Sequence, residues 1–196
     1  MPKILAYHQE VYRKLLHIST CITIVIFTYS FGKHAIIPWI IAIAILFPII
    51  DYSRKYFSFL NHISNIFFRV ITRPYEYQGL SGASWVLLGA GMTLYFFNEN
   101  SAIIAILILG FSDSASALIG IKYGNTHLLN KSLEGSLSFL ITTYVILFLF
   151  SEISFILLMI ATITSTVIEL LSTPKFNDNI LIPFTIALIL ALGDIF

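Results

Sequence analysis

The chain has 196 residues, of which 58% are hydrophobic and 11% are charged, with a formal net charge of +1 and a mean hydropathy of +0.90. Soluble domains carry roughly 25% charged residues, so this composition excludes a soluble globular protein and indicates an integral membrane protein. The single cysteine, Cys21, excludes a disulfide framework and a cysteine-based metal site within one chain. We expect no cleaved signal peptide, because residues 1–14 carry Glu10, Arg13 and Lys14 and no small-residue cleavage site follows the first apolar run.

Seven apolar segments follow one another, and each is predicted to be a membrane helix. They cover roughly residues 15–31, 35–50, 80–97, 101–121, 133–150, 153–172 and 179–196. Several are shorter than the ~20 residues that span a bilayer, so they need flanking residues or a thin membrane. Six spans remain an alternative if 35–50 is re-entrant. We therefore expect an all-α, polytopic transmembrane bundle of about seven spans, forming a single domain over residues 1–196.

Basic residues are distributed unevenly between the predicted loops. If the N-terminus lies in the cytoplasm, Lys33 is the only lysine or arginine of the outer loops. The others fall in inner segments: Lys3, Arg13, Lys14, Arg54, Lys55, Arg69, Arg73, Lys122, Lys131 and Lys175. Positive residues concentrate on the cytoplasmic side of membrane proteins. This bias predicts a cytoplasmic N-terminus, an external C-terminus and an odd number of spans.

The longest connection, residues 51–79, contains a stretch with helical periodicity at about 55–72. Its apolar side chains recur at helical spacing, at Tyr56, Phe59, Leu60, Ile63, Phe67 and Val70. The polar side chains between them are Asn61, His62, Asn65 and Arg69. The pattern predicts an amphipathic helix in the membrane interface, which serves either as a surface element or as a gate for a substrate.

The first span begins with a charged face. In EVYRKLLHIS, four polar residues spaced i, i+3, i+4 and i+7 share one side of the helix at its cytoplasmic end. They are Glu10, Arg13, Lys14 and His17. An arginine and a lysine together suit a phosphate, the arginine by bidentate contact and the lysine as a point charge. The alternative is topological anchoring with an ion pair to Glu10, which leaves His17 unexplained.

The fourth apolar segment carries an acid, Asp113, on a face of small residues. That face also contains Gly110, Ala117, Gly120 and Gly124. An ionised carboxylate inside a membrane is costly unless it is compensated, so such acids usually serve a function. The small face admits either a ligand or a closely packed helix, and in the second case Asp113 would hydrogen bond to that helix.

The start of the fifth apolar segment, NKSLEGSLSF at residues 130–139, has features of an anion site. Ser132 is a candidate N-cap, Glu134 suits the positive helix end and Gly135 leaves room for a ligand. Free backbone N–H groups next to Lys131 would bind a phosphate. Many helices begin this way, so the pattern alone is weak evidence for an anion site. It supports one because this helix start is expected to face the same side of the membrane as the charged face of the first span.

Two further acids follow. Glu169 lies on a polar stripe that also contains Thr162, Ser165, Thr166, Ser172 and Thr173. Such a stripe is typical of an interhelical hydrogen-bond seam or of a functional site, and the ionisable residue favours the second. Asp178 opens the last segment in NDNILIP, where it is a candidate Mg²⁺ ligand or a helix cap. Asn177 and Asn179 are equally suited to the cap.

All of these polar groups lie near the predicted cytoplasmic ends of their helices. Acids, basic residues and a helix N-terminus that converge there suit a nucleoside triphosphate with Mg²⁺ better than an ion pore. Phosphoryl transfer needs cations on the phosphates, carboxylates for the metal and a positioned acceptor. The chain contains no GxxxxGK[ST] loop and no kinase GxGxxG, which excludes the familiar soluble nucleotide-binding folds.

The motifs RKLLH, GLSG, SDSASALIGIKYG, NKSLEGS and E…DNILIP, in this order, resemble the polytopic lipid kinases that use CTP. That family includes dolichol kinase, phytol kinase and CTP-dependent diacylglycerol kinase, and it is related to the phosphatidate cytidylyltransferases. The resemblance covers about residues 10–185. It implies a nucleotide site made of Arg13, Lys14, His17, Gly120, Lys122, Lys131, Ser132 and Gly135. Lys122 is included because Ile121 stands where the family often has a basic residue.

We therefore expect CTP-dependent phosphorylation of a lipid alcohol at the cytoplasmic face, with the lipid entering laterally between helices. Asp113 and Asp178 would hold Mg²⁺, and Glu169 or Glu134 would orient or deprotonate the acceptor hydroxyl. The residues alone argue only for a phosphate-rich ligand, and the preference for CTP comes from the resemblance. One alternative is a phosphatidate cytidylyltransferase that makes a CDP-lipid. The other is a small ion- or proton-coupled transporter with Asp113 and Glu169 as a relay.

The expected partners are CTP, the lipid alcohol and the bilayer, without nucleic acid. The acceptor is expected to be a polyprenol or dolichol, a diacylglycerol or phytol. We expect a multi-pass protein of the inner membrane in a bacterium, or of the endoplasmic reticulum in a eukaryote.

Overall fold

The computed structural model describes residues 6–68, 72–77, 79–129, 131–173 and 177–194. The helices are α1 (Tyr7–Phe31), α2 (Lys33–Ser53), α3 (Ser58–Phe68), the 3₁₀ helix η1 (Pro74–Tyr77), α4 (Gly82–Phe96), α5 (Glu99–Tyr123), α6 (Leu133–Phe150), α7 (Phe155–Leu171) and α8 (Asp178–Gly193). A hairpin of two short strands, β1 (His127–Leu128) and β2 (Lys131–Ser132), connects α5 to α6. The all-α helical bundle is confirmed.

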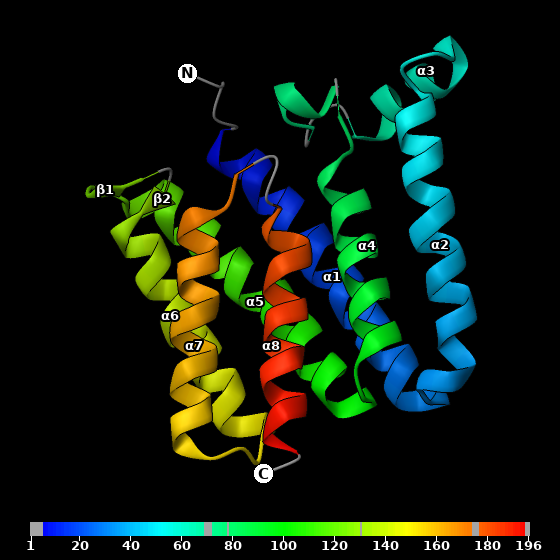
Figure 1. Cartoon of the computed structure of the whole chain (residues 1–196). Coiled ribbons are helices and arrows are strands. Elements are labelled where there is room, and N and C mark those ends of the chain that lie inside the picture. The colour runs from blue at the N-terminus through cyan, green and yellow to red at the C-terminus, as the bar shows by residue number, and fades with distance from the viewer. Residues whose placement is uncertain (1–5, 69–71, 78, 130, 174–176, 195–196) are drawn as a thin grey trace.

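Each of the seven predicted apolar segments corresponds to a helix in the described part of the chain. These helices run alternately up and down the bundle, and the start of α1 and the end of α8 lie at opposite ends of it (Figure 1). α1, α2, α5 and α6 are long and apolar enough to cross a membrane, whereas α4, α7 and α8 are shorter apolar helices. The second segment is one continuous helix, α2, in place of the re-entrant alternative.

Side-chain caps fix where several of these helices begin. Ser132 Oγ accepts a hydrogen bond from the Gly135 N–H at the start of α6, as the sequence predicts. At the start of α8 the cap is Asn177, whose Oδ1 accepts from the Asn179 N–H. Because Asn177 is the cap, the carboxylate of Asp178 is available for contacts with other elements.

α5 lies at the centre of the bundle and belongs to both hydrophobic clusters. One cluster joins α5 to α6, α7 and α8 through Ile108, Phe139 and Ile182, which are fully buried. The other joins α5 to α1, α2 and α4, with Ile106 and Ala90 completely enclosed. Polar groups on the central helix are therefore held at a fixed place between two packed halves.

The close contact between α4 and α8 depends on Gly89. A Cβ at this position would stand 1.9 Å from the backbone oxygen of Asn179, so only glycine allows the first turn of α8 to approach α4 this closely. The contact sets the height of Asp178 in the bundle.

Charged residues divide the bundle into two different ends. Within the described residues, every lysine and arginine except Lys33 lies at the end where α1 starts, which we call the charged end (Figure 1). At the opposite end, the Lys33 N–H donates to Glu99 at 2.6 Å and the Asn98 side chain donates to Asp194 at 2.8 Å. Lys3, Arg69 and Lys175, which also entered the charge argument, lie outside the described residues.

The connection between α2 and α4 contains α3, within the stretch predicted to form an amphipathic helix. α3 covers Ser58–Phe68, and residues 69–71 of the predicted stretch lie outside the described residues. Phe59 and Ile66 are exposed on its surface. Placement of this helix in the membrane interface stays a prediction.

Candidate active site

The centre of the site is an ion pair between α1 and α5. Lys14 Nζ donates to the Oδ2 atom of Asp113, and both residues are buried, with 3% and 6% exposure. His17, one turn below Lys14, places Nε2 3.5 Å from the same oxygen. Nε2 also lies 2.9 Å from the Leu109 carbonyl oxygen, which can only accept, so this nitrogen carries the proton. The carboxylate predicted inside the membrane is therefore compensated by a buried cation.

A second ion cluster stands beside the first and joins β2, α7 and α8. Lys131 Nζ lies 3.0 Å from Glu169 and 3.3 Å from Asp178. Burial lowers the pKa of the Lys131 ammonium, but the carboxylates of Asp178, Glu169 and Asp113 outweigh it and raise that pKa above its ordinary value. Lys131 therefore stays protonated at neutral pH, close to three acids.

Glu169 is completely buried, and its carboxylate is fully bound by neighbouring side chains. Oε1 accepts from the Ser116 hydroxyl at 2.8 Å and Oε2 from the Ser136 hydroxyl at 2.9 Å. Asp178 Oδ2 in turn accepts from the Ser172 hydroxyl at 3.1 Å. These bonds link α5, α6, α7 and α8 at the charged end.

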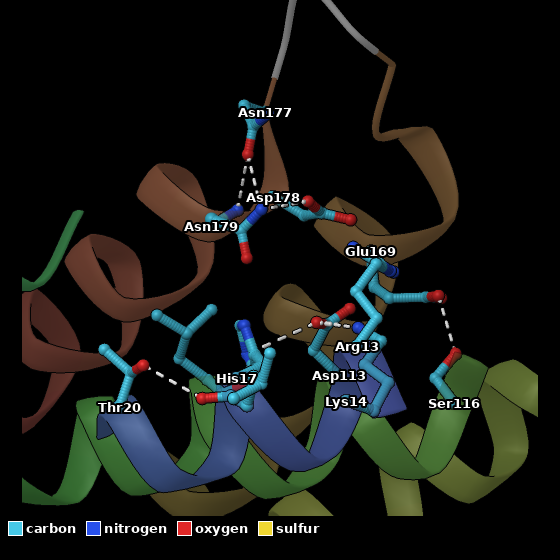
Figure 2. A network of polar contacts seen from close by, with 12 residues as sticks. Arg13, Lys14, His17, Thr20, Asp113, Ser116, Glu169, Asn177, Asp178 and Asn179 are labelled. Atoms are coloured by element: carbon cyan, nitrogen blue, oxygen red, sulfur yellow. Dashed lines mark hydrogen bonds and ion pairs between the residues drawn. The ribbon is translucent and has the colours of Figure 1, made fainter. Parts of the chain in front are cut away.

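Figure 2 shows how the groups converge. Lys14 and His17 point from α1 toward Asp113 on α5, and Arg13 extends beside them. Glu169 and the start of α8, with Asp178 and Asn179, face them from the other side of the network. The structure thus brings together the charged residues that the sequence places at separate helix ends.

A third group of charges surrounds Arg13, on the side of α1 toward the α2–α4 connection. Arg13 and Arg73 both donate to the Oε1 atom of Glu10, which is fully buried, and the Arg73 bond is 3.0 Å long. The other oxygen of Glu10 is buried without a hydrogen-bond partner among the described residues. A Cβ on Gly82 would lie 3.4 Å from Arg13 Nη1, so the guanidinium stands against the first turn of α4.

Two further acids hold the N-terminus of α4. Asp51 Oδ2 accepts from the Ser81 N–H and the Ser84 hydroxyl, both at 2.6 Å. Glu76 Oε1 accepts from the Gly82 N–H at 3.1 Å. Both acids satisfy backbone donors that a helix start otherwise leaves free, and they favour its positive end.

The sequence reasoning missed Asp51 and Glu76 and treated Arg54 only as a topological charge. Arg54 is 7% exposed, and its Nε lies 3.3 Å from Asp51. The available signal was the i, i+3 spacing of Asp51 and Arg54 at the cytoplasmic end of a predicted span. Glu76 has no comparable signal, because the path of its loop depends on tertiary packing.

The structure places Gly120 and Gly135 at a contact between two helices. A Cβ on Gly135 would stand 2.8 Å from the backbone oxygen of Ser116, and a Cβ on Gly120 would stand 2.8 Å from the Ser132 hydroxyl. Gly120 and Gly135 therefore let α5 and α6 pack against each other, and the room expected for a ligand at Gly135 is filled by α5. Ser132 is likewise buried in this contact as the cap of α6.

Two other predicted residues lie away from the ion clusters. The Glu134 carboxylate accepts from the backbone N–H groups of Asn125 and Thr126, both at 3.1 Å, and so holds the loop after α5. Lys122 is exposed, with Nζ 5.0 Å from the ring centre of Tyr123. Neither side chain makes a contact with the Asp113 or Glu169 clusters that would place it on a shared ligand.

The donor set suits a metal ion that arrives with a phosphate. Among the described residues, no three histidine, cysteine, aspartate or glutamate side chains are grouped to hold a metal by themselves. Mg²⁺ in phosphoryl-transfer sites uses one or two carboxylates together with substrate phosphates and water. Asp113 and Asp178, which both lie near Lys131, supply that number.

Comparison with known proteins adds named relatives. An uncharacterised protein of Rickettsia prowazekii is 33% identical over 192 residues, covering 90% of each chain. CTP-dependent diacylglycerol kinase 1 of Saccharomyces cerevisiae is 35% identical over 136 residues, which cover 66% of this chain and 46% of the kinase. The kinase of the same name from Eremothecium gossypii is 34% identical over 74 residues, 35% of this chain and 23% of the kinase.

The chain thus spans less than half the length of the two kinases it matches. No model of a protein family matches the sequence, and no solved structure matches it. The similarity to the Rickettsia protein extends over nearly the whole of both chains, and the kinase match extends over two thirds of this one. The chain belongs to the family of the CTP-dependent lipid kinases.

Proposed function

We propose that this protein transfers the γ-phosphoryl group of CTP to the hydroxyl of a membrane lipid alcohol at the charged end of the bundle. The observation that carries the proposal is the convergence of Lys14–Asp113 with Lys131–Glu169–Asp178 in one partly buried network. The names of two relatives support CTP as the donor and a lipid as the acceptor. The concentration of basic residues supports a multi-pass protein whose charged end faces the cytoplasm.

In this proposal the cations bind the triphosphate. Arg13 offers a planar guanidinium at the edge of the network, and Lys14 and Lys131 offer ammonium groups. In the structure each ammonium is held by a carboxylate, so the lysines are oriented before a phosphate replaces part of those contacts. Cations that are already in position stabilise the charge that develops during transfer without reorganisation.

Asp113 and Asp178 are the carboxylates that would hold Mg²⁺ together with the phosphates. The bound ion would neutralise phosphate charge. Their lysine partners hold both carboxylates in place. His17 supports this arrangement, because its bond to the Leu109 carbonyl fixes the ring next to Asp113.

Of the two glutamates, we assign the function to Glu169. Glu134 is engaged by the loop at Asn125 and Thr126, whereas Glu169 contacts Lys131 directly. Since both oxygens of Glu169 already accept hydrogen bonds from serines, its role is to position Lys131 rather than to take a proton from the acceptor. For Gly120, Ser132 and Gly135 we propose a packing role around this site, which their close contacts support.

The experiment is label transfer with the purified protein reconstituted into phospholipid vesicles. CTP labelled at the γ-phosphate and CTP labelled at the α-phosphate are each incubated with Mg²⁺ and a panel of polyprenol, diacylglycerol, phytol and phosphatidic acid. The proposal predicts that γ-label enters a lipid and α-label does not. Entry of α-label into phosphatidic acid would instead establish the cytidylyltransferase alternative, and solute flux without CTP turnover would establish a transporter.

A further inference from the structure

A cavity of about 400 Å³ lies beside the ion network, between α1, α2, α3, α4 and the first turn of α8. It is polar at the charged end, where Arg13, His17, Asp51 and Arg54 line it. Most of the remaining wall is apolar, with Leu16, Phe47, Ile50, Val86 and Leu87. A site with this profile fits an amphiphile that has a small polar head and an apolar chain.

The apolar half of the cavity reaches the surface that faces lipid. Leu16 on α1 is 51% exposed and Ile50 on α2 is 54% exposed, and both line the cavity. An amphiphile can therefore keep most of its chain in the bilayer while its head occupies the cavity. Pockets that enclose drug-sized ligands start at roughly 300 Å³, so about 400 Å³ holds a head and the first part of a chain only.

The charges on the polar wall balance one another. Two arginines, Arg13 and Arg54, face the cavity together with two acids, Asp51 and Glu76. The acids already hold the start of α4, Arg54 is paired with Asp51, and Arg13 is paired with Glu10. A balanced wall favours an uncharged hydroxyl over a lipid phosphate, because a phosphate would add a double negative charge beside two carboxylates.

The cavity also shares a wall with the ion network. Arg13 and His17 line the cavity, and His17 Nε2 is 3.5 Å from the Asp113 carboxylate on the far side. Asn179 lines it too, next to Asp178 in the first turn of α8. A hydroxyl held at the polar end of the cavity would therefore lie next to a phosphate bound by Lys14.

We infer that this cavity is the acceptor site and that it selects an uncharged lipid alcohol by its head group, without reading the distal chain. The inference rests on the proposed function and names where its acceptor binds. The hydroxyl sits at the polar end near His17, and the chain leaves past Leu16 and Ile50 into the bilayer. The affinity for acceptors should then change little once the chain is longer than the enclosed part.

The first experiment needs no catalysis. A long-chain primary alcohol with a diazirine in its chain is photolysed with the protein in phosphatidylcholine vesicles, and the adducts are mapped by mass spectrometry. We expect adducts on Leu16, Phe47 and Leu87. Their yield should fall when unmodified alcohol is added, and should fall much less when the same amount of phosphatidic acid is added. Adducts on lipid-facing Leu15 should respond to neither competitor. Equal competition by phosphatidic acid, or none by the alcohol, would overturn the inference.

The second experiment compares two neighbouring leucines of α1. Leu16→Trp narrows the mouth of the cavity, and Leu15→Trp is its control, because Leu15 is 54% exposed but lies outside the cavity. A poor fit in an apolar pocket lowers kcat/KM by on the order of tenfold or more, so Leu16→Trp should raise the KM for the alcohol about tenfold. The KM for CTP should not change, and Leu15→Trp should behave as wild type. Equal KM values for the alcohol in both variants would overturn the inference.

The two experiments separate the two possible failures. If the alcohol reduces the adducts but no γ-label is transferred from CTP, the lipid site is supported and the proposed kinase activity is refuted. If γ-label is transferred to the alcohol, but the alcohol does not reduce the adducts and Leu16→Trp leaves the KM unchanged, the kinase activity is supported and the cavity is refuted as its acceptor site.

Discussion

The contact between α4 and α8 gives a sharp test of how the site is built. In a Gly89→Ala variant the new Cβ would stand 1.9 Å from the Asn179 backbone oxygen and 2.9 Å from its carbonyl carbon, whereas real Cβ contacts essentially never fall below 3.0 Å. Backbone cannot rotate away as a flexible side chain can, so the first turn of α8 has to move by about 1 Å. Overpacking of this kind costs roughly 1–3 kcal/mol of folding free energy.

That displacement carries Asp178 away from Lys131, which is 3.3 Å from it in the native arrangement. A misplacement of about 1 Å in a catalytic arrangement costs on the order of 100-fold in rate, so kcat for γ-label transfer should fall by about that factor. Gly91→Ala is the matched control on the same helix. Its Cβ would lie 3.0 Å from the Ala44 side chain on α2, away from the site, and the neighbour needs to yield only slightly.

Both variants are assayed for label transfer and for their melting temperature in the same detergent. The account predicts a large loss of kcat for Gly89→Ala and nearly full activity for Gly91→Ala, even where the two melting temperatures are similar. If Gly89→Ala transferred phosphate as fast as Gly91→Ala, the position of Asp178 would not matter to the reaction, and the metal assignment of that residue would be wrong.

Three further predictions concern the ion clusters. Glu169→Gln should lose most label transfer because Lys131 loses one of its two nearest counterions, whereas Glu134→Gln should keep most of it; similar losses in both would remove the distinction. Lys14→Met should destabilise the protein by roughly 3–5 kcal/mol in chemical unfolding, because it leaves the Asp113 carboxylate without its buried partner. The double variant Lys14→Met with Asp113→Leu should recover most of that stability but remain inactive in the transfer assay. The folded-state pKa of Lys131 is raised above its unfolded-state value, which is already high, so its contribution to stability is fully present below both pKa values and constant from about pH 6 to 9. A difference in unfolding free energy between wild type and Lys131→Met that varied across this pH range would contradict this prediction.

Much of the architecture follows from the sequence. Apolar segments with few charges fix the number and order of the helices, and alternation of helix direction then decides which ends meet. Arg13, Lys14, Asp113, Lys131 and Asp178 converge for this reason, since each stands at the same end of its segment. The cap at the start of α6 was also visible, because a serine before an apolar run has a local role that needs no tertiary information.

Other parts of the site depend on contacts between distant segments. Glu134 turns toward the loop because the hairpin pairs His127 with Ser132 and returns Asn125 and Thr126 to the start of α6, and a hairpin with two-residue strands leaves no periodic pattern. Glycine spacing on a helix is compatible with a ligand or with a neighbouring helix, and only the position of α5 identifies Gly135 as a packing contact.

The central claim is that the buried charges at the charged end form a phosphoryl-transfer centre. It is tested most directly by the rate at which Asp113→Asn moves γ-label from CTP to a lipid alcohol, at equal amounts of folded protein, with wild type and Glu134→Gln alongside. The account predicts transfer by the wild type and by Glu134→Gln, and loss of turnover in a folded Asp113→Asn protein. Near-normal transfer by Asp113→Asn would contradict it.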